Sequence, residues 1–233
     1  MAKRKRTVPK SAAFQAEGLG KDYGDIVALA PLDLTVDPGH LVALIGHNGS
    51  GKSTLLKLGA GLLDATDGTA RIHGKAAGSM GARTRLSYLP DAPVLYDDLS
   101  VREHVEYVAR LHGVDDWEQK GEALIESFGL GNRADDLPVG FSRGLRQKTA
   151  LVLGLVRPFT LLMIDEPFVG LDGTGKKALL DAIDGAKADG HTVMVATHDL
   201  DLVERTDRCV ALRDGELVHD GPVEPAELLA LAG

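Results

Sequence analysis

Short runs of apolar residues, most of them with branched side chains, alternate with longer segments of helical periodicity along most of this chain. The apolar runs at residues 41–45, 161–164, 192–196 and 210–212 predict buried strands. Helical spacing predicts helices over residues 54–63, 101–111, 119–128, 144–156 and 176–188. Strands that alternate with helices are typical of a mostly parallel sheet with crossover helices, so we predict an α/β fold.

The beginning and the middle of the chain have different patterns. Residues 12–18 and 26–36 alternate between apolar and polar positions, with turn residues between them, and predict an N-terminal antiparallel β layer. Residues 91–156 contain few strand signals and predict a helical subdomain. We therefore expect a disordered basic tail at 1–10 and one domain at 11–233. Its α/β core would comprise residues 11–90 and 157–233, around the helical subdomain.

Composition is that of an ordinary soluble protein. The chain has 233 residues, of which 44% are hydrophobic and 26% charged, enough for one large domain with a sizeable core. The longest apolar runs are far too short to cross a bilayer, and no apolar segment follows the basic start, as a signal peptide would require. Cys209 is the only cysteine in the sequence, so no internal disulfide can form, which suits a reducing cytoplasm.

Net charge separates the body of the chain from its start. The formal charge of −8 predicts that the body does not bind nucleic acid. The start is basic, with Lys3, Arg4, Lys5, Arg6 and Lys10. A solvated end is the favoured interpretation of this cluster. Weak attraction to an anionic membrane surface is the alternative, and it matters only if the protein works beside a membrane.

Residues 46–54, which we call the phosphate loop, read GHNGSGKST and match the pattern G-x-x-x-x-G-K-[ST] between a predicted strand and a predicted helix. Glycines let backbone N–H groups turn toward phosphate oxygens, and the helix that follows directs its positive end at the same anion. Lys52 can neutralise phosphate charge, and the Ser53 hydroxyl can ligate Mg²⁺. The predicted nucleotide-binding residues are Gly46, His47, Asn48, Gly49, Ser50, Gly51, Lys52, Ser53 and Thr54.

Two carboxylates follow the apolar run at residues 161–164. A strand there would deliver Asp165 to the C-terminal edge of the sheet, where the phosphate loop also lies and where a carboxylate can hold Mg²⁺. Glu166 should point differently, because successive strand residues alternate in direction, and is placed to polarise an attacking water. Beside a phosphate loop, this interpretation is favoured over two solvated acids at a strand end.

With these motifs the chain resembles the ATP-binding cassette family from about residue 16 to its C-terminus. The family has a signature usually written LSGGQ, and residues 141–148 here read FSRGLRQK. The resemblance assigns this signature to four residues, Ser142, Arg143, Gly144 and Leu145. It implies that Ser142 and the backbone of Gly144 contact the γ-phosphate of ATP bound to a partner subunit. Arg143 and Leu145 depart from the common form, as in drug-exporting cassettes of bacteria.

Other elements of the family occur in order. Tyr23, 23 residues before Gly46, occupies the place of an aromatic ring that stacks on adenine. Asp172, in GLD, resembles a loop that signals across the dimer, and His198 resembles the switch histidine that contacts the γ-phosphate. Asp91 stands where the family usually has glutamine. A carboxylate can still bind Mg²⁺, but it cannot donate hydrogen bonds as an amide does.

The resemblance implies an ATPase that uses ATP and Mg²⁺, with Lys52, Glu166 and His198 as catalytic residues. Expected partners are a separate transmembrane permease subunit and a second cassette, as a homodimer or a related pair, in a head-to-tail ATP sandwich. Residues 90–103 should line the cleft that receives the permease. We expect export of an unidentified substrate from the inner face of the cell membrane. The alternatives are a soluble cassette in translation or DNA repair, and a regulatory subunit with degenerate chemistry.

Overall fold

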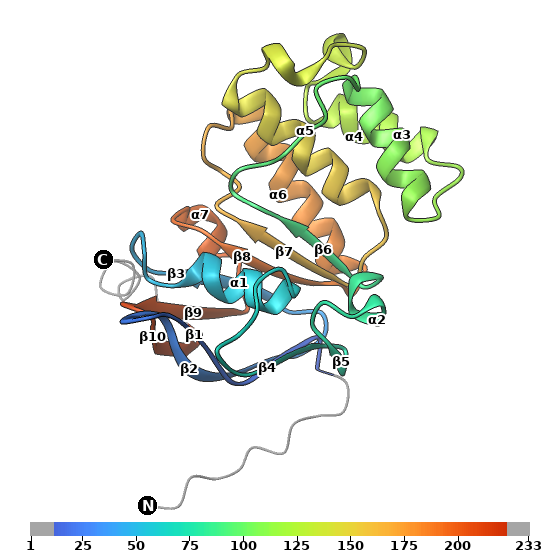
Figure 1. Cartoon of the computed structure of the whole chain (residues 1–233). Helices are drawn as coiled ribbons and strands as arrows, with labels where there is room; N and C mark the ends of the chain where they lie inside the picture. The colour runs from blue at the N-terminus through green and yellow to red at the C-terminus, as the bar shows by residue number, and fades with distance from the viewer. Residues whose placement is uncertain (1–11, 223–233) are drawn as a thin grey trace, which may run out of the picture.

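Two β-sheets organise the fold, and the structure, a computed structural model, describes residues 12–222 (Figure 1). The first sheet is antiparallel, with strand order β2-β1-β4-β5. Its strands are β1 (Phe14–Tyr23), β2 (Ile26–Val36), β4 (Asp67–Ile72) and β5 (Lys75–Ala76). The predicted antiparallel layer is confirmed, although β1 extends to Tyr23 and the strands β4 and β5 were not predicted.

The second sheet is parallel except for one edge strand. Its order is β10-β9-β3-β8-β7-β6, and only β10 runs antiparallel to its neighbour. The strands are β3 (Leu41–Ile45), β6 (Leu86–Leu89), β7 (Leu161–Asp165), β8 (Thr192–Ala196), β9 (Arg208–Arg213) and β10 (Glu216–Gly221). Every residue of β3, β7 and β8 is buried. Such continuous apolar strands are expected where both faces of a parallel sheet are covered, and the predicted sheet is confirmed.

Helices cover both faces of the parallel sheet. They are α1 (Lys52–Ala60), α2 (Met80–Arg83), α3 (Val101–Leu111), α4 (Glu118–Ser127), α5 (Arg143–Val156), α6 (Gly173–Ala188) and α7 (Leu200–Val203). The predictions for α3 to α6 agree within three residues at each end. The predicted α1 helix runs past the observed C-terminus at Ala60, because Gly61 takes a left-handed conformation with φ of 70° and ends the helix.

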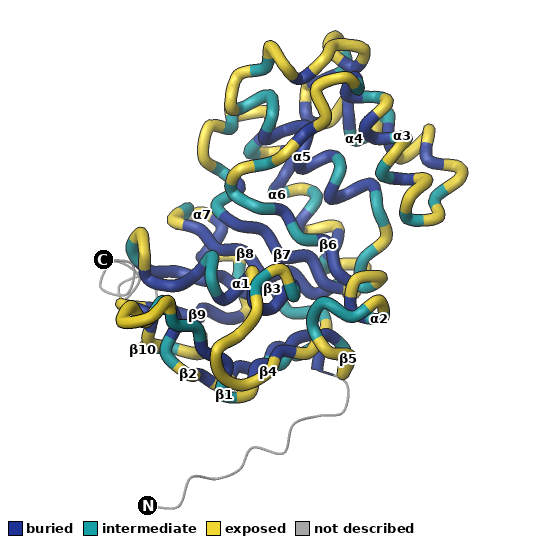
Figure 2. Tube along the Cα trace, viewed as in Figure 1, coloured by how far each residue is buried: buried dark blue, intermediate teal, exposed yellow. Residues whose placement is uncertain are grey.

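Residues of β7 contribute alternately to two hydrophobic clusters, one on each face of the sheet. Leu161 and Met163 pack with α1 and the antiparallel sheet, whereas Leu162 and Ile164 pack with α3 to α6. Figure 2 shows the central strands as a continuous buried layer between these two sets of elements. The sheet is therefore held from both sides, and its strand ends are fixed positions on which a site can be built.

The chain leaves the parallel sheet after β6, forms α3, α4, α5 and two short 3₁₀ helices, and returns at β7. This segment corresponds to the region that we expected to be a helical subdomain, and Figure 1 shows its helices at the upper end of the molecule. The expected basic tail lies outside the described residues. No helix within residues 12–222 is long and apolar enough to cross a membrane.

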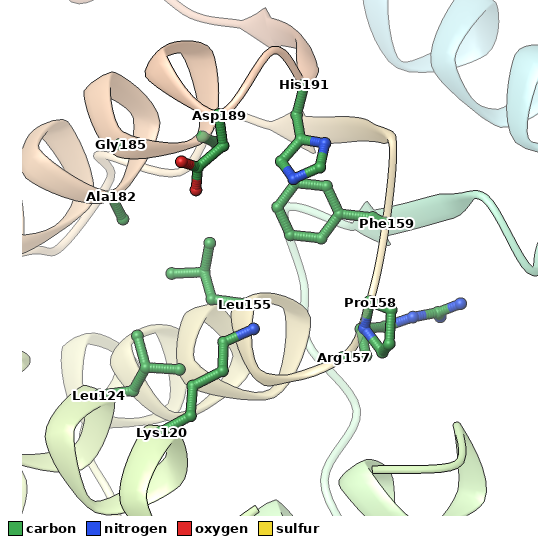
Figure 3. Close-up of a pocket in the computed structure, with 11 residues that line it drawn as sticks. Lys120, Leu124, Leu155, Arg157, Pro158, Phe159, Ala182, Gly185, Asp189 and His191 are labelled. Carbon is green, nitrogen blue, oxygen red and sulfur yellow. The ribbon is translucent and has the colours of Figure 1, made fainter.

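A cavity of about 400 Å³ lies where α4 and α5 meet α6 (Figure 3). Leu155 and Phe159 supply apolar lining, with Lys120 and Asp189 at its polar margin. None of the residues assigned to nucleotide or metal binding lines it. The cavity is therefore separate from the site described next.

Candidate functional site

The phosphate loop joins β3 to α1 in a conformation that requires glycine. Gly46 and Gly51 have φ angles of 142° and 105°. A Cβ atom on Gly46 would lie 2.1 Å from the Leu212 carbonyl oxygen, and one on Gly51 would lie 2.9 Å from that of Ala28. Neither position can accept a side chain without moving backbone, which gives a physical reason for two of the glycines in the motif.

A turn far along the chain supports this loop. The N–H of Gly215, between β9 and β10, donates to the Ser50 carbonyl oxygen at 3.1 Å, and the Ala30 N–H donates to the Gly215 carbonyl oxygen at 2.8 Å. His47 Nε2 lies 3.2 Å from Asp214 Oδ1 in the same turn. Sequence reasoning missed this support, because the turn residues Asp214 and Gly215 carry no signal of what they contact.

Lys52 begins α1 and lies inside the phosphate loop, with 5% of its surface exposed. Its ammonium donates to the carbonyl oxygens of Gly46 at 2.6 Å and His47 at 3.2 Å. The loop therefore curves around a buried positive charge. This arrangement suits an anionic ligand, because the charge and the N–H groups at the start of α1 act on the same space.

Asp165 is the last residue of β7 and is almost fully buried, at 2% exposed. Burial raises the pKa of its carboxyl group, and the Ser53 hydroxyl and nearby lysines act in the opposite direction. Its Oδ1 atom has no hydrogen-bond partner among the described residues. A buried carboxylate oxygen of this kind, beside a hydroxyl, fits a hard divalent cation or its water shell.

Glu166 follows the end of the strand rather than continuing it. Its φ of 45° lies in the left-handed region, and its N–H donates to the Ala196 carbonyl oxygen at 2.9 Å. Strand alternation was therefore the wrong reason for its distinct direction. A reversal of the backbone, held to β8, turns the Glu166 side chain toward the phosphate loop. Such strain in a residue other than glycine is typical of functional positions.

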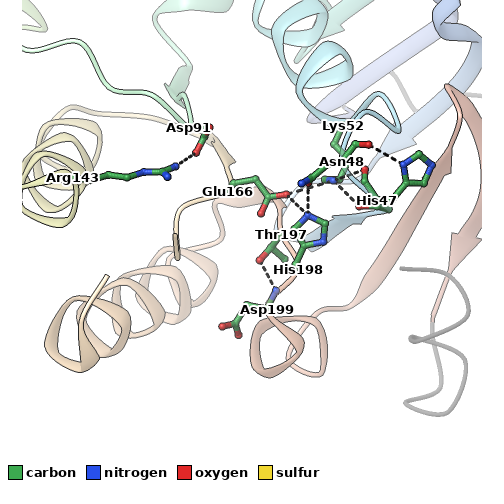
Figure 4. Close-up of polar contacts among 10 residues, drawn as sticks. His47, Asn48, Lys52, Asp91, Arg143, Glu166, Thr197, His198 and Asp199 are labelled. Carbon is green, nitrogen blue, oxygen red and sulfur yellow. Dashed lines mark hydrogen bonds and ion pairs between the residues drawn. The ribbon is translucent and has the colours of Figure 1, made fainter. Parts of the chain in front are cut away.

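His198 completes a polar cluster with Glu166 (Figure 4). Its Nε2 atom lies 3.1 Å from Glu166 Oε1 and 3.2 Å from Asn48 Oδ1. Lys52 Nζ lies 3.5 Å from the same Glu166 oxygen. The structure thus brings together the predicted base, the predicted switch histidine and the phosphate-loop lysine. Sequence reasoning placed Asn48 in the loop but missed its contact with His198.

A buried turn residue positions this histidine. The Thr197 N–H donates to the Leu44 carbonyl oxygen at 3.0 Å, which extends the pairing of β8 with β3. The Thr197 hydroxyl oxygen accepts the Asp199 N–H at 2.9 Å. The backbone before His198 is therefore fixed to the sheet and the backbone after it to the Thr197 side chain, and the imidazole is directed at the phosphate loop.

Asp91 lies just beyond β6, at the same edge of the sheet as Asp165. The nearby charge of Asp91 contributes to the raised pKa of Asp165. Its Oδ1 atom accepts a hydrogen bond from Arg143 Nη2 at 3.1 Å. Within residues 12–222 there is no group of three or more His, Cys, Asp or Glu side chains that could hold a metal ion by themselves. Ser53, Asp165 and Asp91 would thus need phosphate oxygens or water to complete a Mg²⁺ shell.

The signature segment lies at the start of α5, away from the phosphate loop. Ser142 is the N-cap of this helix, and its hydroxyl oxygen accepts the Leu145 N–H at 3.4 Å. Gly144 packs so closely that a Cβ atom would lie 2.4 Å from the Gly170 carbonyl oxygen. Among the described residues, no hydrogen bond or ion pair joins positions 142–145 to the phosphate loop of the same chain. Figure 4 shows Arg143 on the side of Asp91 that is remote from Lys52.

Asp172 has two structural contacts in its own subunit. Its side chain is the N-cap of α6, accepting the Gly175 N–H at 2.8 Å, and it also pairs with the buried Lys148 of α5 at 2.7 Å. These contacts lower the pKa of Asp172. The predicted role in signalling across a dimer stays a prediction, and these two contacts were not foreseen.

Tyr23 lies at the turn between β1 and β2, opposite Ile26, and is 55% exposed. Lys21 Nζ lies 5.1 Å from the centre of its ring. The Ala28 carbonyl oxygen, further along β2, lies close to Gly51, so this hairpin passes beside the phosphate loop. An exposed ring there is available for stacking.

A glycine loop between strand and helix, a buried lysine and an acidic strand end at one sheet edge define a P-loop nucleotide-binding domain. Residues 29–169 match the model of the ABC transporter family, and the chain belongs to that family. Its members with this cassette are ATPases, and we describe the chain as an ATP-binding cassette ATPase.

Similar proteins cover almost the whole chain. The ABC-type transporter ATP-binding protein EcsA of Bacillus subtilis is 36% identical over 81% of this chain and 78% of its own length. The macrolide export ATP-binding/permease protein MacB 1 of Aeromonas hydrophila is 30% identical over 91% of this chain, but only 35% of its own length. A solved structure of an ATP binding subunit of an ABC transporter is 31% identical, with a TM-score of 0.85 over 95% of each chain.

Proposed function

We propose that this chain supplies energy to an exporter, hydrolysing MgATP beneath a separate permease subunit at the inner face of the cell membrane. The observation that carries the catalytic part is the contact of Glu166 with both Lys52 and His198 beside the phosphate loop. The export part is supported by the family and by the similarity to a protein whose name joins macrolide export, ATP-binding and permease.

The chemistry proposed is in-line attack of water on the γ-phosphate of ATP. Lys52 and the loop N–H groups bind and neutralise the phosphates, and Glu166 orients the water and accepts its proton. His198, which lies beside Glu166, would contact the γ-phosphate. Ser53, Asp165 and Asp91 would hold Mg²⁺, which when bound offsets phosphate charge.

A second cassette would complete the site. Ser142 and Gly144 stand at the start of α5, where backbone N–H groups and the positive helix end can receive a phosphate. Since these residues lie apart from the phosphate loop of their own subunit, a head-to-tail dimer would bring them to the ATP of the partner. An isolated subunit should therefore bind ATP and turn it over slowly.

The segment at residues 90–103 offers an apolar surface to the permease. Val94 is 93% exposed, and the Tyr96 ring packs edge-on against the Tyr107 ring with centroids 5.7 Å apart. Buried His104 fixes this segment, because its Nε2 accepts the Tyr96 N–H at 2.9 Å and its Nδ1 lies 2.8 Å from the Ser100 carbonyl oxygen. The Nδ1 atom therefore carries the proton and donates it. A preformed, exposed apolar surface favours docking of another protein.

The test is capture of the partner. A tagged Glu166→Gln chain would be purified with ATP from detergent-solubilised membranes of its own host. We expect one polytopic membrane protein to co-purify, and Val94→Asp in the same background should lose it. Met80→Asp, at another exposed apolar side chain, is the matched control and should keep it. Recovery of ribosomes or DNA-repair proteins without a membrane protein would instead support the alternative of a soluble cassette.

A further inference from the structure

One ion pair joins Asp91 and Arg143, two of the three residues at which the chain departs from the usual cassette motifs. Arg143 Nη2 donates to Asp91 Oδ1 at 3.1 Å, although the two residues are 52 positions apart. Asp91 follows β6 and Arg143 is the first residue of α5. The pair thus connects the loop that leaves the parallel sheet with the signature segment of the same subunit (Figure 4).

Further contacts hold the first turns of α5 against the sheet edge. Gly144 packs against the Gly170 carbonyl oxygen, in the loop after β7. One turn further along the helix, Lys148 pairs with Asp172 at 2.7 Å. The start of α5 is therefore attached to both loops that carry predicted metal and signalling residues, and Arg143 makes the attachment to the loop of Asp91.

The Asp91 carboxylate needs such a partner. It follows β6, the parallel neighbour of β7, so it lies at the same sheet edge as Asp165, and the two negative charges repel each other. Within the described part of the chain, Arg143 is the cation that pairs with Asp91. Both side chains are about half exposed, so the pair adds little to the stability of the fold. What it fixes is the place and direction of the Asp91 carboxylate.

We propose that Arg143 acts within its own subunit as the positioning residue of Asp91, holding that carboxylate at the metal-binding edge beside Asp165. The inference rests on the proposed binding of MgATP and assigns Arg143 a role other than contact with the ATP of the partner. It makes the arginine of the signature and the aspartate after β6 one functional unit, so that neither departure from the common motifs acts alone.

A double-mutant cycle on the full chain tests this assignment. Two Mg²⁺ concentrations would be measured for each variant: the one that gives half-maximal binding of a fluorescent ATP analogue, and the one that gives half-maximal turnover. The variants are Arg143→Ala, Asp91→Asn and the double variant. If Arg143 acts through Asp91, each single change raises both concentrations about tenfold, because losing the arginine costs about as much as losing the carboxylate that it positions. The double variant should be no worse than the poorer single variant, because the second change removes nothing further. Arg143→Lys should restore most of the loss.

The matched control is the Arg205–Asp184 pair, which has a similar distance of 3.0 Å and similar exposure but joins α6 to the turn after α7. Arg205→Ala and Asp184→Asn should leave the Mg²⁺ dependence unchanged. Effects of Arg143→Ala and Asp91→Asn that multiply in the double variant would overturn the proposal, as would a lowered Mg²⁺ requirement in Arg143→Ala. The latter would make Arg143 only a cation that competes with the metal. Failure of the wild-type chain to hydrolyse ATP would count against the proposed function, whereas the binding measurement would still decide the role of Arg143.

Discussion

His198 Nε2 lies 3.1 Å from Glu166 Oε1, although the two residues follow different strands of the parallel sheet. Glu166 follows β7 and His198 follows the adjacent strand β8, so the parallel order of the sheet brings both to one edge. The same Glu166 oxygen faces Lys52, which starts α1 after β3. Three neighbouring strands thus deliver a carboxylate, an imidazole and an ammonium to one place, as ligand sites in such sheets commonly do.

Glu166→Gln should separate binding from turnover. We expect ATP affinity to be kept and turnover to fall about 10²-fold or more, because the amide cannot accept the proton from water. ATP that is bound but not hydrolysed should then hold two cassettes together, and light scattering with ATP should show a dimer. Glu204→Gln, at an exposed carboxylate directly after α7, should behave as wild type. Substantial hydrolysis by the Glu166→Gln chain would exclude Glu166 as the base.

Two glycines of the phosphate loop should respond differently to alanine. Gly46→Ala places a Cβ atom 2.1 Å from the Leu212 carbonyl oxygen, whereas Gly49→Ala meets nothing within 4 Å. Both residues have positive φ angles, of 142° and 87°. We expect Gly49→Ala to cost about 1 kcal/mol, or 2–4 °C in Tm, and Gly46→Ala to cost at least about twice as much. Thermal unfolding without nucleotide measures both, and equal losses would show that the close approach to Leu212 is not maintained.

The sheet and the phosphate loop could be predicted because their determinants are local. Burial on both faces makes β3, β7 and β8 continuous apolar runs, and the phosphate loop needs its glycines within a few residues. The remaining site residues were predicted from the resemblance to known cassettes. The error at the end of α1 is of a different kind, because the apolar pattern of residues 54–63 continues while Gly61 changes the sign of φ.

Contacts between distant segments could not be predicted. Nothing in the sequence around Arg143 indicates that it pairs with Asp91, since that contact depends on how α5 packs against the edge of the sheet. The support of Ser50 by Gly215 has the same origin. The direction of Glu166 depends on one backbone angle, for which the residue type gives no hint, since a glutamate disfavours positive φ.

Tyr23 allows a test of the adenine site that leaves the phosphate site intact. Tyr23→Ala should weaken ATP binding about three- to tenfold, the effect of losing one aromatic stack, with kcat changed much less. Tyr23→Phe should keep the affinity, because stacking needs the ring and not the hydroxyl. Isothermal titration with ATP and with inorganic triphosphate distinguishes the cases. A loss in Tyr23→Ala that is equal for triphosphate would mean that the side chain acts on the loop and not on the base.

Asp165 should reveal a conflict between stability and metal binding. Its folded pKa is raised, mainly by burial, above the ordinary value of 3.8. The folded chain therefore holds the proton more tightly than the unfolded chain, and stability falls as the pH rises from about 4 through the folded pKa. At neutral pH the ionised group destabilises the fold. Asp165→Asn keeps the shape without the charge, so without nucleotide and with chelator its Tm at pH 7 should exceed that of wild type by about 2–4 °C.

The pH dependence provides the decisive comparison. The Tm difference between Asp165→Asn and wild type should shrink as the pH is lowered toward the unfolded value, because wild type then carries a neutral carboxyl group too. Addition of MgATP at pH 7 should reverse the order, since wild type gains from binding the metal and the variant does not. Asp116→Asn, at an exposed position before α4, should show neither effect. An Asp165→Asn chain less stable than wild type in chelator would mean that the carboxylate is stabilised by its lysine and Ser53 neighbours more than burial opposes it.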